Sequence, residues 1–285
     1  MSVWEVLHGD CIEVMRTLPA ESVDAVITSP PYAMQRKATY GGVPGAEYPA
    51  WTVAWMAEVR RLLKPDGSVV INIRPHIKNG QISDYVLRTR LALRAVGWNE
   101  CEELIWNKIS GPPLGHVNRP RRSWESLHWF AKHGRPYCDP RAAGGPPVEK
   151  RARQMSGRAR THGWGHVRDT QVVIPLAERS RVTDVIAVSV RKNEDDSPTN
   201  KHPAPYPPDL AEWCGQLICP PGGTVLDPFS GSASTGVAAI RNGWDYIGID
   251  AVEEYVDMSR RRLAVVALEE GSADIPLFDD DGGAA

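Results

Sequence analysis

The segment Leu226–Gly236 reads LDPFSGSASTG and decides the fold of this chain of 285 residues. A short apolar run leads into it and a run of small residues follows, which predicts a strand, a glycine loop and a helix in succession. Gly231 lets the backbone approach a nucleoside with no side chain in between. Asp250 comes 23 residues after Asp227, at the end of the next predicted strand, where a carboxylate can accept hydrogen bonds from both ribose hydroxyls. The segment therefore predicts a binding site for a nucleoside cofactor.

Asp227 also separates two classes of cofactor. In a dinucleotide site the helix after the glycine loop receives a pyrophosphate, and a carboxylate just before that loop would repel it. The same carboxylate suits a cofactor that carries an ammonium and a sulfonium group.

Strand and helix patterns continue outward from this segment in both directions. Val23–Thr28 predicts a buried strand, Trp51–Leu63 a helix and Ser68–Ile73 the next strand. Further patterns predict a helix over 85–96, a strand near 104–106, a helix starting at 207, a strand over 246–249 and a last helix that runs through 268. This β-α-β-α succession predicts an α/β fold with a doubly wound, mostly parallel sheet.

The middle of the chain differs from both ends. From about residue 109 to 200 the periodicity gives way to Pro, Gly, Arg and His, with a strand-like section near Val182–Val190. A loop of that length is improbable in a compact domain unless it has a function, so we interpret it as an inserted lobe. The last residues, 270–285, are predicted to be a disordered acidic tail.

Charge is distributed unevenly along the chain. The formal net charge is −2, yet residues 108–168 hold thirteen basic residues and only three acidic ones. A basic region on an acidic body is typical of a polyanion-binding lobe, because Lys and Arg supply affinity by neutralising phosphates. The arginines predicted to contact phosphates or guanine edges are Arg119, Arg121, Arg122, Arg151, Arg153, Arg158 and Arg160.

Cysteine usage and hydropathy exclude several classes of protein. The five cysteines form no Cys-x-x-Cys pair and have no nearby His at zinc-site spacing, so neither a metal site nor a disulfide framework is predicted. The sequence shows no secretory signal and no apolar run long enough to span a membrane, which predicts a cytoplasmic protein.

The segment Thr28–Tyr32 reads TSPPY and resembles motif IV of the DNA amino-methyltransferases, in which Asp, Asn or Ser precedes Pro-Pro and an aromatic residue. The DPFSG of Asp227–Gly231 is similar to motif I of that family. The β class of the family places motif IV first, the recognition region next and motif I last, which is the order found here. The resemblance implies a sheet of the seven-stranded methyltransferase type, with a catalytic half at 1–108, an inserted target-recognition region at 109–200 and a cofactor-binding half at 201–269.

Two weaker matches extend the resemblance. The HGDC of His8–Cys11 resembles the Gly-Asp element of the family, which implies that Asp10 accepts a hydrogen bond from the cofactor adenine; the alternative is that Asp10 caps the following helix. Lys201–Pro207 resembles motif X, although His202 and Tyr206 could equally be packed core residues. The cofactor implied is S-adenosylmethionine. Its implied binding residues are Asp10, Cys11, Thr28, His202, Pro203, Asp227, Pro228, Phe229, Gly231, Ser232 and Asp250.

The resemblance assigns catalysis to Ser29, Pro30, Pro31 and Tyr32. An exocyclic amino group is a poor nucleophile because its lone pair is delocalised into the ring. Hydrogen bonds from the amine to the Ser29 hydroxyl and the Pro30 carbonyl would aim that lone pair at the methyl group, with the prolines fixing the carbonyl. Tyr32 would stack on a base flipped out of duplex DNA.

Several alternatives stay open from the sequence. Ser before Pro-Pro is more typical of N4-cytosine methylation, whereas N6-adenine methylation remains the alternative within the class. An alternative of another class is a catalytically silent DNA-binding protein, and RNA or a protein amide could replace DNA as substrate. No Pro-Cys dipeptide occurs, which disfavours carbon methylation. Ala233 stands where the family usually has a second glycine, which we expect to crowd the cofactor loop slightly.

The resemblance also indicates partners and location. It implies double-stranded DNA as the partner, in a bacterial or phage-infected cell, for a monomer or homodimer with a restriction endonuclease as a candidate cognate enzyme.

Overall fold

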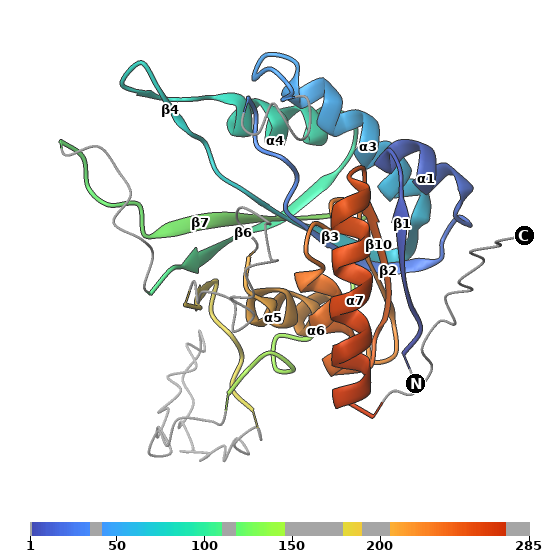
Figure 1. Ribbon diagram of the computed structural model, residues 1–285. Coiled ribbons are helices and arrows are strands. Elements are labelled where there is room, and N and C mark those ends of the chain that lie inside the picture. Colours follow the sequence, from blue (N-terminus) through green and yellow to red (C-terminus); the bar gives the residue numbers. More distant parts are fainter. Residues whose placement is uncertain (1, 35–41, 110–117, 146–178, 190–205, 272–285) are drawn as a thin grey trace, which may run out of the picture.

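The computed structural model describes residues 2–34, 42–109, 118–145, 179–189 and 206–271 (Figure 1). In this part of the chain one large sheet runs through the middle of the molecule. Its eight strands are, in spatial order, β1 (Trp4–His8), β10 (Asp245–Asp250), β9 (Thr224–Asp227), β2 (Val23–Thr28), β3 (Leu63–Ile73), β7 (Trp124–Ala131), β6 (Asn99–Asn107) and β8 (Val185–Ala187). The first five strands in this spatial order, β1, β10, β9, β2 and β3, are parallel to one another. Strand β7 is antiparallel to both of its neighbours, and β8 is parallel to β6. The prediction of a doubly wound, mostly parallel sheet is confirmed.

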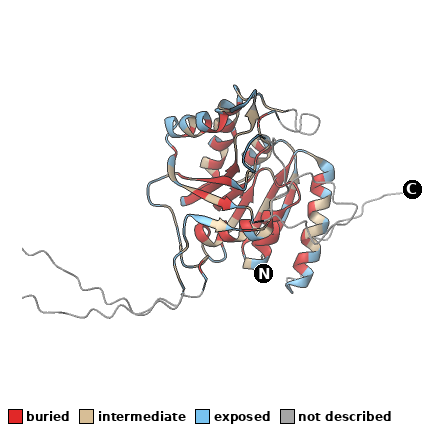
Figure 2. Cartoon of the chain, turned by 90° about the vertical axis from the view of Figure 1, so that its left-hand side faces the viewer, coloured by how far each residue is buried: buried red, intermediate tan, exposed pale blue. Residues whose placement is uncertain are grey.

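Helices cover both faces of this sheet (Figure 1). One face carries α1 (Cys11–Thr17), α3 (Tyr48–Leu62) and α4 (Tyr85–Ala95), and the other carries α5 (Pro208–Ile218), α6 (Ser234–Asn242) and α7 (Glu253–Glu269). Figure 2 shows the buried residues concentrated in the strands and on the inward sides of these helices.

Strand β2 shows how the sequence produces this two-sided core. Every residue of the strand is buried. Because successive side chains of a strand point to opposite faces, Ala25 and Ile27 pack on the α5–α6 side and Val26 packs on the α3 side. A continuous apolar run therefore reads as a strand that is covered on both faces.

The order of the strands reverses between β9 and β2. After β9 the chain passes through α6 to β10 on one side, whereas after β2 it passes through α3 to β3 on the other side. In open α/β sheets the crevice at such a switch point, beyond the carboxyl ends of the strands, is where ligands bind. The two loops at this crevice are those that follow Thr28 and Asp227.

Two segments differ from the sequence prediction. Residues 124–131, which fall within the predicted insert 109–200, form β7 between β3 and β6 in the main sheet. The strand-like section near Val182–Val190 contains the short edge strand β8. Residues 110–117, 146–178 and 190–200 of the predicted insert, and the tail from 272, lie outside the described residues.

A small hairpin leaves the sheet just after β3. It consists of β4 (Ile77–Lys78) and β5 (Gln81–Ile82), joined by Asn79 and Gly80, which both have positive φ. Two residues in tandem with φ > 0 are typical of the tight turns that match strand twist. The turn residues are exposed, and the hairpin projects away from the main sheet (Figure 1). Across the described residues, we find no helix that is long and apolar enough to cross a membrane.

Candidate active site at the carboxyl edge of the sheet

The loop after β9 turns sharply before α6 begins. Gly231 has φ +53°, which glycine adopts without strain, and the backbone N–H of Gly231 donates to Asp250 Oδ2 at 2.9 Å. Helix α6 has no side-chain cap, so its first N–H groups are available to a ligand. Ala233, the residue before the helix, has φ 56° and is fully buried. The consequence of alanine at this position is therefore backbone strain in the left-handed region, rather than crowding alone.

Asp227 is the buried centre of the crevice. Its Oδ1 accepts hydrogen bonds from the Thr28 hydroxyl at 2.6 Å and from the Phe229 N–H at 3.1 Å. Its Oδ2 accepts hydrogen bonds from the Thr235 hydroxyl at 2.8 Å and the Tyr206 hydroxyl at 3.1 Å. Burial raises the pKa of Asp227 to about 6, although these hydrogen bonds oppose the effect.

The bond between Thr28 and Asp227 joins the two signatures that the sequence placed 199 residues apart. Tyr206 and Pro207 are the described residues of the segment that resembles motif X, and the Tyr206 hydroxyl reaches the same carboxylate. His202 and Pro203 lie outside the described residues. Thr28, Tyr206 and Asp227, from three separate motifs of the sequence, therefore lie together at one crevice.

The ends of β10 and β1 form the neighbouring wall. Asp250 is buried, its Oδ1 accepts from the Val252 N–H at 2.9 Å, and its backbone carbonyl accepts from the Gly9 N–H at 3.0 Å. Asp10 caps α1, with Oδ1 accepting from the N–H groups of Ile12 at 2.9 Å and Glu13 at 3.2 Å. The capping alternative for Asp10 is confirmed. It leaves the second carboxylate oxygen of this exposed residue for a ligand.

Cys11 faces the interior rather than the crevice. Its side chain is buried in the core beneath α1, and burial raises the pKa of the thiol to about 12. The thiol therefore stays protonated and packs as a small apolar group.

The Ser-Pro-Pro-Tyr segment follows β2 and is held from α3. The Tyr48 hydroxyl donates to the Pro31 carbonyl at 3.0 Å. Ser29 and Tyr32 are partly exposed, whereas Pro30 is buried. The bond from Tyr48 therefore fixes the Pro31 carbonyl of this loop against α3.

Aromatic side chains of α3 also contact the cofactor loop. The ring centroid of Phe229 lies 5.5 Å from that of Trp51 and 5.3 Å from that of Trp55, in tilted and edge-on arrangements. Helix α3 therefore supports both loops of the crevice, one by a hydrogen bond and the other by ring packing.

One acidic residue that sequence reasoning did not single out lies beside Tyr32. The Tyr32 hydroxyl donates to Glu125 Oε2 at 3.0 Å, and Glu125 is buried at the start of β7. Its other oxygen binds Lys108 Nζ and lies 3.4 Å from Arg74 Nε. The available signal was that Glu125 is one of only three acids in a strongly basic segment.

Comparison with known proteins identifies the family. A family model described as a DNA methylase, covering N6 and N4 enzymes, matches residues 23–261. The chain belongs to this DNA methylase family. Among curated relatives it is similar to the type II methyltransferase M.PvuII of Proteus hauseri, with 27% identity over 90% of this chain and 82% of the relative. It is also similar to M.SmaI of Serratia marcescens, with 27% identity over 91% and 90%.

Solved structures agree with the fold. The PvuII DNA methyltransferase, named as cytosine-N4-specific, superimposes with a TM-score of 0.68 at 24% identity, over 96% of this chain and 94% of that one. The M1.HpyAVI–SAM complex matches with a TM-score of 0.60 at 21% identity, over 92% of this chain and 99% of that one. As a member of the DNA methylase family, the protein is a DNA methyltransferase that uses S-adenosylmethionine.

The crevice of the methylase fits the charge of that cofactor. Carboxylates stand at or just beyond the ends of three adjacent strands: Asp227 on β9, Asp250 on β10 and Asp10 after β1. Such a set repels a diphosphate and attracts an ammonium or sulfonium group. The described residues contain no cluster of His, Cys, Asp and Glu that could hold a metal ion.

The predicted DNA-binding arginines fall into two groups. Arg119 donates to the Gly80 carbonyl and Arg122 to the Pro75 carbonyl, so both brace the segment that carries the β4–β5 hairpin. Arg121 is exposed in the same connection to β7. Arg151, Arg153, Arg158 and Arg160 lie outside the described residues.

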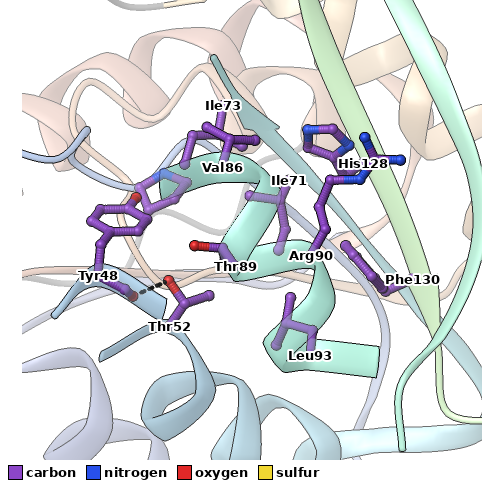
Figure 3. Close-up of a pocket in the computed structure, with 11 residues that line it drawn as sticks. Tyr48, Thr52, Ile71, Ile73, Val86, Thr89, Arg90, Leu93, His128 and Phe130 are labelled. Atoms are coloured by element: carbon purple, nitrogen blue, oxygen red, sulfur yellow. Dashed lines mark hydrogen bonds between the residues drawn. The ribbon is translucent and has the colours of Figure 1, made fainter. Parts of the chain in front are cut away.

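A small cavity lies behind the catalytic loop and is not the substrate site. It measures about 10 Å³, room for about one water molecule, and lies between α3, α4, β3 and β7 with Pro30 in its wall (Figure 3). His128 lies at its rim beside Arg90, and neither ring nitrogen of His128 has a hydrogen-bond partner. Burial, with the Arg90 charge adding to it, lowers the pKa of His128 to about 4, so the ring is neutral near neutral pH.

Proposed function

We propose that this methylase transfers a methyl group to the exocyclic N4 amine of a cytosine that is flipped out of duplex DNA. The proposal depends on Ser29, which precedes Pro-Pro at the end of β2 and lies next to Thr28, whose hydroxyl is bonded to Asp227. The cytosine-N4-specific PvuII enzyme, similar in both sequence and fold, supports the same base.

The residues of the catalytic loop would orient the amine. The Ser29 hydroxyl oxygen and the Pro30 carbonyl would accept hydrogen bonds from the two N–H groups of the amine. These bonds would draw the nitrogen toward tetrahedral geometry. S-adenosylmethionine supplies a methyl group activated on a sulfonium. The nitrogen lone pair forms the new N–C bond as the C–S bond breaks, and the nitrogen then loses a proton to solvent. Catalysis is mainly positioning, because a single in-line displacement is the whole reaction.

Tyr32 would provide the stacking surface for the flipped base. Its ring follows the loop directly and remains partly exposed, whereas its hydroxyl is held by Glu125. A ring fixed at one end suits the stacking of a flat base.

The cofactor would lie across the ends of β1, β10 and β9. Asp250 would accept from the ribose hydroxyls, Asp10 from the adenine amine, and Asp227 would attract the charged methionine end. Pro228, Phe229, Gly231 and Ser232 would line the loop, with Thr28 acting through its bond to Asp227 and Cys11 through its backbone. His202 and Pro203, which lie outside the described residues, would pack around the methionine end of the cofactor, as the resemblance to motif X implies.

Duplex DNA would approach the carboxyl edge of the sheet. The seven predicted arginines belong to the basic region 109–200, and the three described ones, Arg119, Arg121 and Arg122, lie in the connection that leads to Glu125. Charged side chains of this kind neutralise phosphates and give salt-dependent affinity. We further propose that the methylase acts in the cytoplasm as a monomer or homodimer, alongside a restriction endonuclease that recognises the same DNA sequence.

Mass spectrometry of nucleosides from DNA of an expressing host tests the base. We expect N4-methylcytosine, which disappears with Ser29→Ala because loss of the acceptor lowers the rate by about a hundredfold or more. Ser22→Ala is the matched control, since the Ser22 hydroxyl bonds the Pro19 carbonyl before β2, at the opposite edge of the sheet. Methyladenine alone would refute the assignment to cytosine.

A further inference from the structure

We propose that Glu125 is a positioning residue of the methylase, which holds the Tyr32 ring where the target base stacks. The proposal rests on the stacking role proposed for Tyr32 and adds a residue to which no role in the reaction has been given. Glu125 does not touch the base in this scheme and acts only through the Tyr32 hydroxyl.

The geometry of Glu125 is that of a fixed support. Its side chain is 7% exposed, it comes from a central strand of the sheet, and its Oε2 accepts the Tyr32 hydroxyl at 3.0 Å. Tyr32, by contrast, lies in a loop outside any regular element. A hydrogen bond from a loop side chain to a rigid strand restricts the orientation of that side chain.

Two cations keep the carboxylate of Glu125 in place. Lys108 Nζ binds Oε1 and also lies 4.4 Å from the Trp106 ring centroid, and Arg74 Nε lies 3.4 Å from the same oxygen. With one oxygen held by cations, the other is free to accept from Tyr32. Hydrogen bonds to an ionised acceptor are stronger than neutral ones.

The support for Tyr32 comes from three separate parts of the chain. Arg74 follows β3, Lys108 follows β6 and Glu125 begins β7. The Lys108 N–H also donates to the Ser123 carbonyl at 2.6 Å, which closes the base of the connection that carries Arg119 and Arg122. The predicted DNA-contacting connection and the predicted base-stacking ring therefore meet at Glu125.

A double-mutant cycle with Tyr32→Phe and Glu125→Gln tests the proposal. Total methyl transfer from S-adenosylmethionine to unmethylated genomic DNA is measured, with kcat and KM separated, so the result does not depend on which base is modified. We expect each single variant to lose about tenfold to a hundredfold in kcat, the range for one charge-assisted hydrogen bond, with the KM for cofactor unchanged. The double variant should lose no more than the worse single variant, because Glu125→Gln weakens the same bond that Tyr32→Phe removes.

A matched control distinguishes positioning from general damage to the sheet. Glu103 on β6 accepts the Ser126 hydroxyl at 2.8 Å and pairs with Arg90 at 2.9 Å, so Glu103→Gln disturbs a similar network away from Tyr32. It should change kcat by less than about threefold.

Tyr32→Phe removes one oxygen atom and keeps the ring, so it remains informative even where Glu125→Gln unfolds. Wild-type kcat in Tyr32→Phe, or additive losses in the double variant, would overturn the proposal. If the methylated base in the product DNA is adenine and not cytosine, the proposed function is refuted, but the inference about Glu125 still holds.

Discussion

Replacing Asp227 by asparagine should stabilise the free protein at pH 8 while it weakens cofactor binding. The carboxyl is buried, and its pKa is raised from 3.8 to about 6. Because the folded pKa exceeds the unfolded one, this group destabilises the folded state wherever it is ionised. The penalty is absent below pH about 4, grows between pH about 4 and about 6, and stays at about 3 kcal/mol at higher pH.

The local hydrogen bonds can accept the amide. The carbonyl of an asparagine can replace Oδ1, which receives the Thr28 hydroxyl and the Phe229 N–H. Its NH2 group would replace Oδ2, where both partners, Thr235 and Tyr206, are hydroxyls that can accept as well as donate. Allowing about 1 kcal/mol for imperfect geometry, we expect a net gain of about 2 kcal/mol at pH 8.

Urea unfolding at pH 8 and pH 4.5, together with calorimetric titration of S-adenosylmethionine, measures both effects. We expect the gain in stability to shrink toward pH 4.5, and the affinity for the cofactor at pH 8 to fall at least about tenfold from loss of the charge. Asp24→Asn is the control, because Asp24 is also buried but pairs with Lys64 at 2.8 Å at the amino edge of the sheet. That variant should lose stability and keep cofactor affinity. A loss of more than about 2 kcal/mol in Asp227→Asn at pH 8, or a gain independent of pH, would refute the reasoning.

Three further outcomes follow from other positions. The pKa of His128 is lowered from 6.5 to about 4, so protonation of the buried ring opposes folding. This penalty is absent above about pH 6.5, and it lowers the free energy of unfolding by up to about 3 kcal/mol as the pH falls toward 4. Urea unfolding should find this loss reduced in His128→Leu. Ala233→Gly should change the free energy of unfolding by less than about 1 kcal/mol, because glycine relieves the strain of the left-handed conformation and this offsets the lost methyl group. The control Ala238→Gly, within α6, should cost about 2 kcal/mol. Equal losses in the two variants would show that Ala233 is unstrained. Tyr48→Phe frees the Pro31 carbonyl and should lower kcat about tenfold with unchanged cofactor affinity in steady-state assays, and an unchanged kcat would show that the loop holds itself.

The sequence was most informative where local pattern and chemistry coincide. The strand that ends at Asp227, the glycine loop and the helix after it follow directly from apolar runs and turn residues, and the structure places them as predicted. The same holds for β2 and the Ser-Pro-Pro-Tyr segment. At these places the backbone conformation is set by nearby residues, so a linear pattern is sufficient.

Strand β7 shows why the remainder was not predicted. Its sequence, WESLHWFA, buries Glu125 and His128, two residue types that ordinarily indicate a surface. Glu125 is tolerated inside because Tyr32, 93 residues away, and two cations satisfy it. Such a partner set exists only after the sheet has formed, which is why neither the strand nor its acidic residue was identified in advance.

The pairing of β1 with β10 has a consequence for the synthesis of the protein. Residues Trp4–His8 leave the ribosome early, but their partner, Asp245–Asp250, comes near the end of the chain. Because translation adds about 5–20 residues per second, β1 stays unpaired for tens of seconds. During that time its backbone groups, and the flank of β2 that later meets β9, are unpaired edges that can associate with other chains. We expect nascent chains to depend on chaperones, and premature stop products to aggregate rather than bind DNA. Activity therefore requires that β10 has been made and has paired with β1.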